Sequence, residues 1–165
     1  MERRKHHRFS ATAFLNRPLT VTPLPPFIGK PAKGKLIDLS AGGLAMLINQ
    51  IIPQGTRLKL TINFPDHTIL EADTEVKHMI PRDRHYLHGL EFLSIGSAMV
   101  ERIAKMSADY IDCEQRIHAN SLNACVGAEC AFFTMCTKQE RTNLIVNLDE
   151  ELLLDFKLLT PANKP

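Results

Sequence analysis

Two stretches of alternating polar and apolar side chains constrain the fold of this chain more than any other feature. Residues 57–64 read Arg-Leu-Lys-Leu-Thr-Ile-Asn-Phe, which has the two-residue period of a half-buried strand. Residues 70–80 repeat the period over a longer distance, with the charged side chains Glu71, Asp73, Glu75 and Lys77 at the intervening positions. The predicted inner face of this long strand consists of Leu70, Ala72, Thr74, Val76, His78 and Ile80.

Four further strands are predicted from the same alternation and from the turn residues between them. They cover residues 9–14 with a continuation at 19–22, then 35–40, 44–48 and 86–92. In the last of these strands, Tyr86, His88, Leu90 and Phe92 form the inward set. Closely spaced prolines exclude a helix between residues 17 and 34. The fold class predicted is therefore mainly β, a small six-stranded antiparallel barrel.

After residue 97 the apolar period changes from that of a strand to that of a helix. The apolar positions are Met99, Ile103, Met106, Tyr110, Cys113 and Ile117. We expect a helix over residues 97–117 with Ser97 as its N-cap. Two uses of its apolar stripe remain open, namely packing on the barrel or pairing with a second copy as a homodimer.

Residues 1–118 are predicted to form one domain, and residues 119–165 a cysteine-containing extension of unknown role. Apolar patches at residues 131–135 and 144–159 indicate that the extension is an ordered packing element. Acidic residues 149–151 favour a helix start there. The helical face would contain Leu152, Phe156 and Leu159.

Positive charge is concentrated at the N-terminus. The formal net charge is +2, but residues 1–8 carry +3, from Arg3, Arg4, Lys5 and Arg8 against Glu2. A field this local suits a small anionic ligand better than a long nucleic acid. Arginine guanidinium groups can hold a phosphate bidentately and stack on a purine.

A short turn at residues 38–43 offers the complementary chemistry. The carboxylate of Asp38 and the hydroxyl of Ser40 can accept hydrogen bonds from the N–H groups of a guanine edge. Gly42 and Gly43 permit backbone conformations that a side chain would forbid. The arm and the turn together suit a guanine nucleotide.

Arg4-x-x-x-Arg8 followed by Asp38-x-Ser40-x-x-Gly43 resembles the PilZ domain, a bacterial receptor module for the second messenger cyclic di-GMP. The stretch at residues 88–92, His-Gly-Leu-Glu-Phe, resembles the end of the last barrel strand in that family. The resemblance covers about residues 1–117 and implies a barrel followed by a helix.

By this resemblance, Arg4 and Arg8 hold phosphate and contact guanine, Asp38 and Ser40 read the guanine edge, and Gly43 keeps the turn open. Arg3, just before the motif, would add a further phosphate or stacking contact. The position before the motif varies in the family, so the resemblance leaves open whether one ligand molecule or a stacked pair of molecules is bound.

Two rival functions fit the sequence less well. A PilZ-like adaptor that binds a protein and no nucleotide usually lacks the arginine arm, whereas this chain has it. A small nucleic-acid-binding barrel would need exposed aromatic side chains along a basic groove, and the sequence contains no tryptophan. Nothing resembles a nucleophile elbow, a phosphate-binding loop or a carboxylate pair, so we expect no enzyme activity.

The cysteines and histidines are assigned structural roles. The spacings of Cys113, Cys125, Cys130 and Cys136 do not match metal-binding knuckles, so we expect free, buried thiols and no metal or cofactor. His78 and His88 are expected to be core or rim histidines.

We expect a cytoplasmic protein. No apolar stretch follows the N-terminal charges, and the longest weakly charged stretch, residues 122–136, is shorter than the roughly 20 residues that a membrane span needs. Because the arm opens the chain, we expect no effector domain upstream of it, and the output would pass through an unidentified protein partner. Ordering of the arm on ligand binding would supply the signal.

Overall fold

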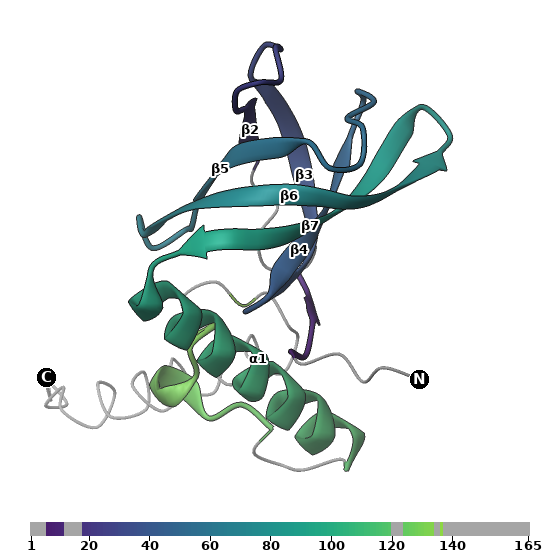
Figure 1. The fold of residues 1–165 in the computed structure, drawn as a ribbon. Helices are drawn as coiled ribbons and strands as arrows, with labels where there is room; N and C mark the ends of the chain where they lie inside the picture. The colour runs from purple at the N-terminus through teal and green to yellow at the C-terminus, as the bar shows by residue number, and fades with distance from the viewer. Residues whose placement is uncertain (1–5, 12–17, 120–123, 134–135, 137–165) are drawn as a thin grey trace, which may run out of the picture.

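The computed structural model describes residues 6–11, 18–119, 124–133 and 136. These residues form a β-barrel with one long helix packed at one end (Figure 1). The elements are β1 (Phe9–Ser10), β2 (Pro18–Pro23), β3 (Ala32–Ser40), β4 (Gly43–Ile48), β5 (Arg57–Asn63), β6 (Ile69–Arg82), β7 (His85–Ile95), α1 (Ser97–His118) and the short 3-10 helix η1 (Gly127–Glu129).

The sheet closes on itself and confirms the predicted antiparallel barrel. Six strands follow one another in the order β3-β2-β5-β6-β7-β4, and β4 pairs with β3 to complete the circle. The strand β1 is an extra one, which pairs with the end of β3 through Phe9↔Leu39 and Ser10↔Asp38. The strand predicted over residues 9–14 is thus only partly described, since residues 12–14 lie outside the described residues.

The barrel interior follows the predicted alternation in β5 and in the first half of β6. Leu70, Ala72, Thr74 and Val76 are buried, but His78 and Ile80 are exposed, so the prediction of the inner face is wrong at these two positions. The cause is a β-bulge: Val76 pairs with Leu90 and His78 with Gly89, which leaves Lys77 as an extra residue. One extra residue reverses which face each later side chain occupies.

His88 is a core histidine, as predicted. Its ring is fully buried. The amide of Ile52 donates to Nε2 (3.2 Å), and Nδ1 lies 3.2 Å from the carbonyl oxygen of Tyr86. Because Nε2 accepts, the proton of the neutral ring belongs on Nδ1. Burial lowers the pKa of His88 below its ordinary value.

The helix α1 begins as predicted, but its N-cap is Gly96, not Ser97. The carbonyl of Gly96 accepts hydrogen bonds from the amides of Met99 and Val100. Ile103 and Met106 are fully buried in the barrel core, so this part of the apolar stripe packs on the barrel. Pairing of the helix with a second copy stays a prediction. No helix of the described chain has the length and apolar character needed to cross a membrane.

The described part of the extension packs on α1. Phe132 is buried against Phe9 and Tyr110, with ring centroids 5.2 and 6.3 Å away. The amide of Ala131 donates to the carboxylate of Asp109 (2.6 Å). The division of the chain at residue 118 stays a prediction, and the proposed helical face at Leu152, Phe156 and Leu159 lies outside the described residues.

The four cysteines, Cys113, Cys125, Cys130 and Cys136, form no disulfide among the described residues. Each is only partly buried, so the prediction of buried thiols is wrong. Burial raises the pKa of Cys130, which keeps this thiol protonated and weakly nucleophilic at neutral pH. Within the described ranges, which include all four thiols, no three His, Cys, Asp or Glu side chains are placed to hold a metal ion.

Candidate ligand-binding site

The turn between β3 and β4 is fixed by hydrogen bonds from both sides. The hydroxyl of the buried Ser40 donates to the carbonyl oxygen of Gly43 (3.0 Å), which closes the turn. The amide of Phe92 donates to the carbonyl of Gly42 (3.1 Å), which ties the turn to β7. The Ser40 hydroxyl donates within the turn, and its lone pairs remain able to accept from a ligand.

Gly43 is required by the close approach of two strands. Its φ is +156°, a conformation that L side chains rarely adopt, and a Cβ there would lie 2.1 Å from the carbonyl oxygen of Leu90. Gly43 pairs with Glu91 of β7, so any side chain would push β4 away from β7. The resemblance implied a glycine that keeps the turn open; the structure gives it a role in barrel closure.

The arm reaches the turn because β1 lies along the end of β3. The guanidinium Nη1 of Arg8 lies 3.5 Å from Oδ1 of Asp38, and both side chains are about 30% exposed. This is an ion pair without a hydrogen bond: Oδ1 of Asp38 is itself inaccessible to solvent, yet it accepts no hydrogen bond among the described residues. A buried acceptor without a donor is costly, so this oxygen suits a ligand N–H group.

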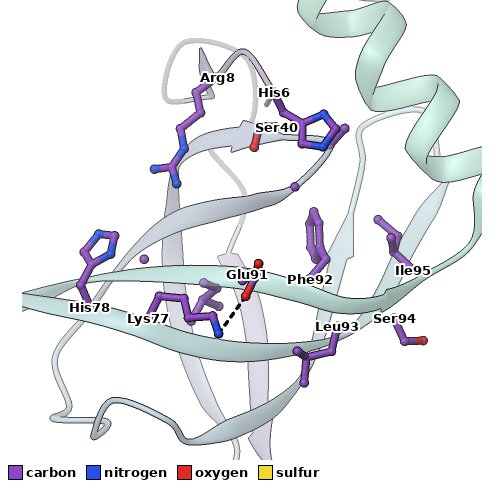
Figure 2. Close-up of a pocket in the computed structure, with 14 residues that line it drawn as sticks. His6, Arg8, Ser40, Lys77, His78, Glu91, Phe92, Leu93, Ser94 and Ile95 are labelled. Atoms are coloured by element: carbon purple, nitrogen blue, oxygen red, sulfur yellow. Dashed lines mark ion pairs between the residues drawn. The ribbon is translucent and has the colours of Figure 1, made fainter. Parts of the chain in front are cut away.

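Beside the turn lies an open cavity of about 860 Å³, within the range of small-molecule sites (Figure 2). One wall is the arm and the turn, and the facing wall is formed by β6 and β7. The lining residues are His6, Arg8, Ser40, Ala41, Gly42, Lys77, His78 and all of residues 89–95.

The facing wall supplies residues that the sequence did not predict as part of the site. Figure 2 shows Lys77 joined to Glu91, with an Nζ to Oε2 distance of 2.8 Å, and Glu75 lies equally close to Nζ. The hydrogen bonds that Lys77 donates to these two carboxylates raise the pKa of Lys77. The ring of His78 sits directly on Gly89, where a Cβ would lie 1.9 Å from Cε1. Lys77 and His78 line the cavity at the bulge, and alternation alone does not reveal a bulge.

The structure brings together four of the six predicted site residues. Arg8 and Ser40 line the cavity, whereas Asp38 and Gly43 adjoin it and contact those two residues. Arg3 and Arg4 lie outside the described residues.

A smaller cavity of about 360 Å³ joins the site to the helix. It shares His6 and Ala41 with the larger one, and its far side is formed by α1 at Ala104, Ser107, Ala108, Ile111 and Asp112. The hydroxyl of Ser107 donates to the carbonyl of His7 (3.3 Å). The arm thus contacts the turn and the helix at consecutive residues.

A comparison of the sequence with protein-family models finds the PilZ domain over residues 2–109. The match spans the arm, the whole barrel and half of α1. The chain belongs to the PilZ domain family. No curated protein sequence gives a significant match to the chain.

Several solved structures share the fold at low sequence identity. The chain is similar to the PilZ domain of Escherichia coli YcgR with c-di-GMP, at 20% identity and a TM-score of 0.52, covering 73% of this chain and 99% of that one. It is similar to the K. pneumonia MrkH–c-di-GMP complex, at 21% identity and a TM-score of 0.55, covering 71% of this chain and 56% of that one. The chain is also similar to the Bacillus subtilis inhibitor of motility MotI/DgrA, at 19% identity and a TM-score of 0.51, covering 73% of this chain and 54% of that one. The chain therefore spans only about half the length of MotI and of MrkH.

Proposed function

We propose that this PilZ chain is a receptor for cyclic di-GMP that reports binding to a partner protein. The observation that carries the proposal is the meeting of Arg8 and Asp38 at the edge of the larger cavity. One group can hold a phosphate and the other can accept from a guanine edge. Two of the similar PilZ structures are complexes with c-di-GMP, which supports the same ligand here.

In the proposed complex, a phosphate oxygen takes the place of Asp38 at the Arg8 guanidinium. The carboxylate of Asp38 then accepts from guanine, which supplies the donor that Oδ1 lacks. The Ser40 hydroxyl accepts a second guanine donor, and Gly43 holds the turn in place. Arg4 and Arg3 add phosphate or stacking contacts from the arm. The second guanine is proposed to lie toward His78 on the facing wall.

The output is proposed to travel through the arm and α1 to a cytoplasmic protein partner. Ligand contacts at Arg3, Arg4 and Arg8 would order the start of the arm across the mouth of the cavity. Because the carbonyl of His7 accepts a hydrogen bond from Ser107, a shift of the arm would also change its contact with the helix α1. The protein would act as an adaptor without catalysing a reaction, and a homodimer through residues 97–117 is a further way to transmit the signal.

Equilibrium dialysis with cyclic di-GMP, cyclic di-AMP and GTP tests the proposal. We expect saturable binding of cyclic di-GMP, with much weaker binding of the other two, and the ratio of bound ligand to protein gives the stoichiometry. Equal retention of all three nucleotides, or of none, would refute the assignment. A pull-down from a lysate with and without cyclic di-GMP would then identify a ligand-dependent partner.

A further inference from the structure

The loop between β2 and β3, residues 24–31, carries an apolar tip at the end of the barrel opposite α1 (Figure 1). The tip consists of Phe27 and Ile28. Ile28 is fully exposed, at 102% of its reference accessibility, and Phe27 is 39% exposed. Single exposed apolar residues are common, but Phe27 and Ile28 are adjacent in one loop, and together they form an apolar surface that the described residues leave exposed.

The loop is held in shape by its own contacts. The amide of Leu24 donates to the carbonyl of Arg57 (2.9 Å), and the amide of Phe27 donates to the carbonyl of Leu24 (3.0 Å). Gly29 packs on the ring of Pro23, so closely that a Cβ would lie 2.9 Å from Cγ. Prolines within the loop further restrict its backbone. The tip is therefore presented outward without a large cost of ordering.

Positive charge lies beside the tip and is not neutralised by the fold. Lys30, Lys33 and Lys35 are all exposed, and the last two alternate on the outer face of β3. None of the three takes part in an ion pair within the described chain. The sequence contains no Asp or Glu between Glu2 and Asp38.

We propose that the tip and the three lysines form a docking surface for an anionic lipid bilayer. Phe27 and Ile28 enter the interfacial layer, and Lys30, Lys33 and Lys35 contact the negatively charged headgroups. A lipid surface fits better than an acidic protein because Ile28 stands clear of all neighbours. A protein partner would have to provide a pocket for it, whereas a bilayer accepts a convex apolar tip directly.

The apolar tip and Lys30 lie beyond one end of β3, and the nucleotide site lies at its other end. The loop leads into Ala32 at the start of the strand, and Asp38 and Ser40 lie at its end. Over nine residues the strand spans roughly 30 Å, so a bilayer at the tip leaves the cavity and α1 accessible. The proposal does not depend on nucleotide binding.

The absence of tryptophan from the sequence permits a direct test. Ile28→Trp places a single fluorophore at the tip, and Ile69→Trp places one at an exposed site on β6 as the matched control. With vesicles of phosphatidylcholine containing about a third phosphatidylglycerol, we expect the emission of Ile28→Trp to shift to shorter wavelength and that of Ile69→Trp to stay unchanged.

Co-sedimentation of the full chain with the same vesicles measures how much single residues contribute to membrane binding. Lys30→Gln and Lys33→Gln should each weaken binding about fivefold, and Ile28→Ser roughly tenfold. Lys105→Gln on α1 should leave binding unchanged. All these positions are exposed, so the variants should fold.

Three results would overturn the proposal. The first is no sedimentation with anionic vesicles. The second is equal binding to pure phosphatidylcholine, since that would remove the role of the lysines. The third is an Ile28→Trp shift with soluble polyglutamate but not with vesicles, which would assign the surface to an acidic protein partner instead.

Discussion

The guanidinium of Arg8 lies 3.5 Å from the carboxylate of Asp38, at the place where β1 joins the end of β3. These two groups, which are proposed to contact different parts of one nucleotide, therefore lie next to each other in this structure. Both side chains are partly exposed, so the pair contributes at most about 1 kcal/mol to the stability of the fold. Substitutions at either position should report on binding, because the barrel does not depend on them.

Asp38→Ala should reduce the preference for guanine more than it reduces affinity for phosphate. A carboxylate accepts from the N–H groups of guanine, and adenine does not present that pair of donors. The measurement is the ratio of dissociation constants for cyclic di-GMP and cyclic di-AMP. Glu101→Ala, an exposed acid on α1, is the matched control. If Asp38→Ala weakens both ligands by the same factor, Asp38 supports the turn and does not read the base.

Gly43→Ala should destabilise the protein by about 3 kcal/mol or more, because the new Cβ would collide with the backbone carbonyl of Leu90. Urea denaturation measures this loss. Gly89→Ala is the informative comparison, since the atoms nearest to its Cβ would belong to the ring of His78 and not to the backbone. The double variant Gly89→Ala/His78→Ala should recover stability relative to Gly89→Ala alone. A loss of under 1 kcal/mol for Gly43→Ala would contradict the proposed role in barrel closure.

Stability should fall as the pH is lowered below neutrality, in part because of His88. Burial holds the pKa of His88 below its ordinary value of 6.5 in the folded chain. The unfolded chain therefore binds more protons between the two pKa values, and the stabilisation present above pH 6.5 is lost as the pH falls toward the folded pKa. The limiting slope for one proton is about 1.4 kcal/mol per pH unit. His88→Gln should flatten the dependence of the unfolding free energy on pH, measured by urea denaturation between pH 7 and pH 5. An unchanged slope would show that His88 does not contribute to this dependence.

The alternation of side chains predicted the barrel because β5 and the first half of β6 bury one face each. The same pattern failed at His78 and Ile80, since it contains no information on the bulge at Lys77. The facing wall of the cavity was missed because its position opposite the arm depends on the long-range pairing of β4 with β7. The proximity of Arg8 and Asp38 follows from pairing between β1 and β3, which is long-range, so only the family resemblance could suggest it. Gly43 was identified in the turn, but its close approach to Leu90 depends on the packing of β4 on β7.

Cyclic di-GMP should slow hydrogen exchange at residues 3–5 of the arm. Arg3, Arg4 and Lys5 carry charge and no large apolar side chain, so their ordering would depend on contacts with the anionic ligand. The strand β5, with Leu58, Leu60 and Ile62 in the core, should exchange at the same rate with and without ligand. Protection of residues 3–5 before ligand is added would mean that the arm is pre-formed, and α1 would then have to carry the signal.

The most direct test of the account is calorimetric titration with cyclic di-GMP of the unaltered chain, Arg8→Ala and Arg84→Ala. Arg84 is an exposed arginine on the turn between β6 and β7 and does not line the cavity. We expect saturable binding to the unaltered chain and to Arg84→Ala, and a loss of about 1.5 to 3 kcal/mol for Arg8→Ala, the scale of a hydrogen bond to a charged group. No heat of binding to the unaltered chain, or equal affinity of Arg8→Ala, would contradict the assignment of this site to cyclic di-GMP.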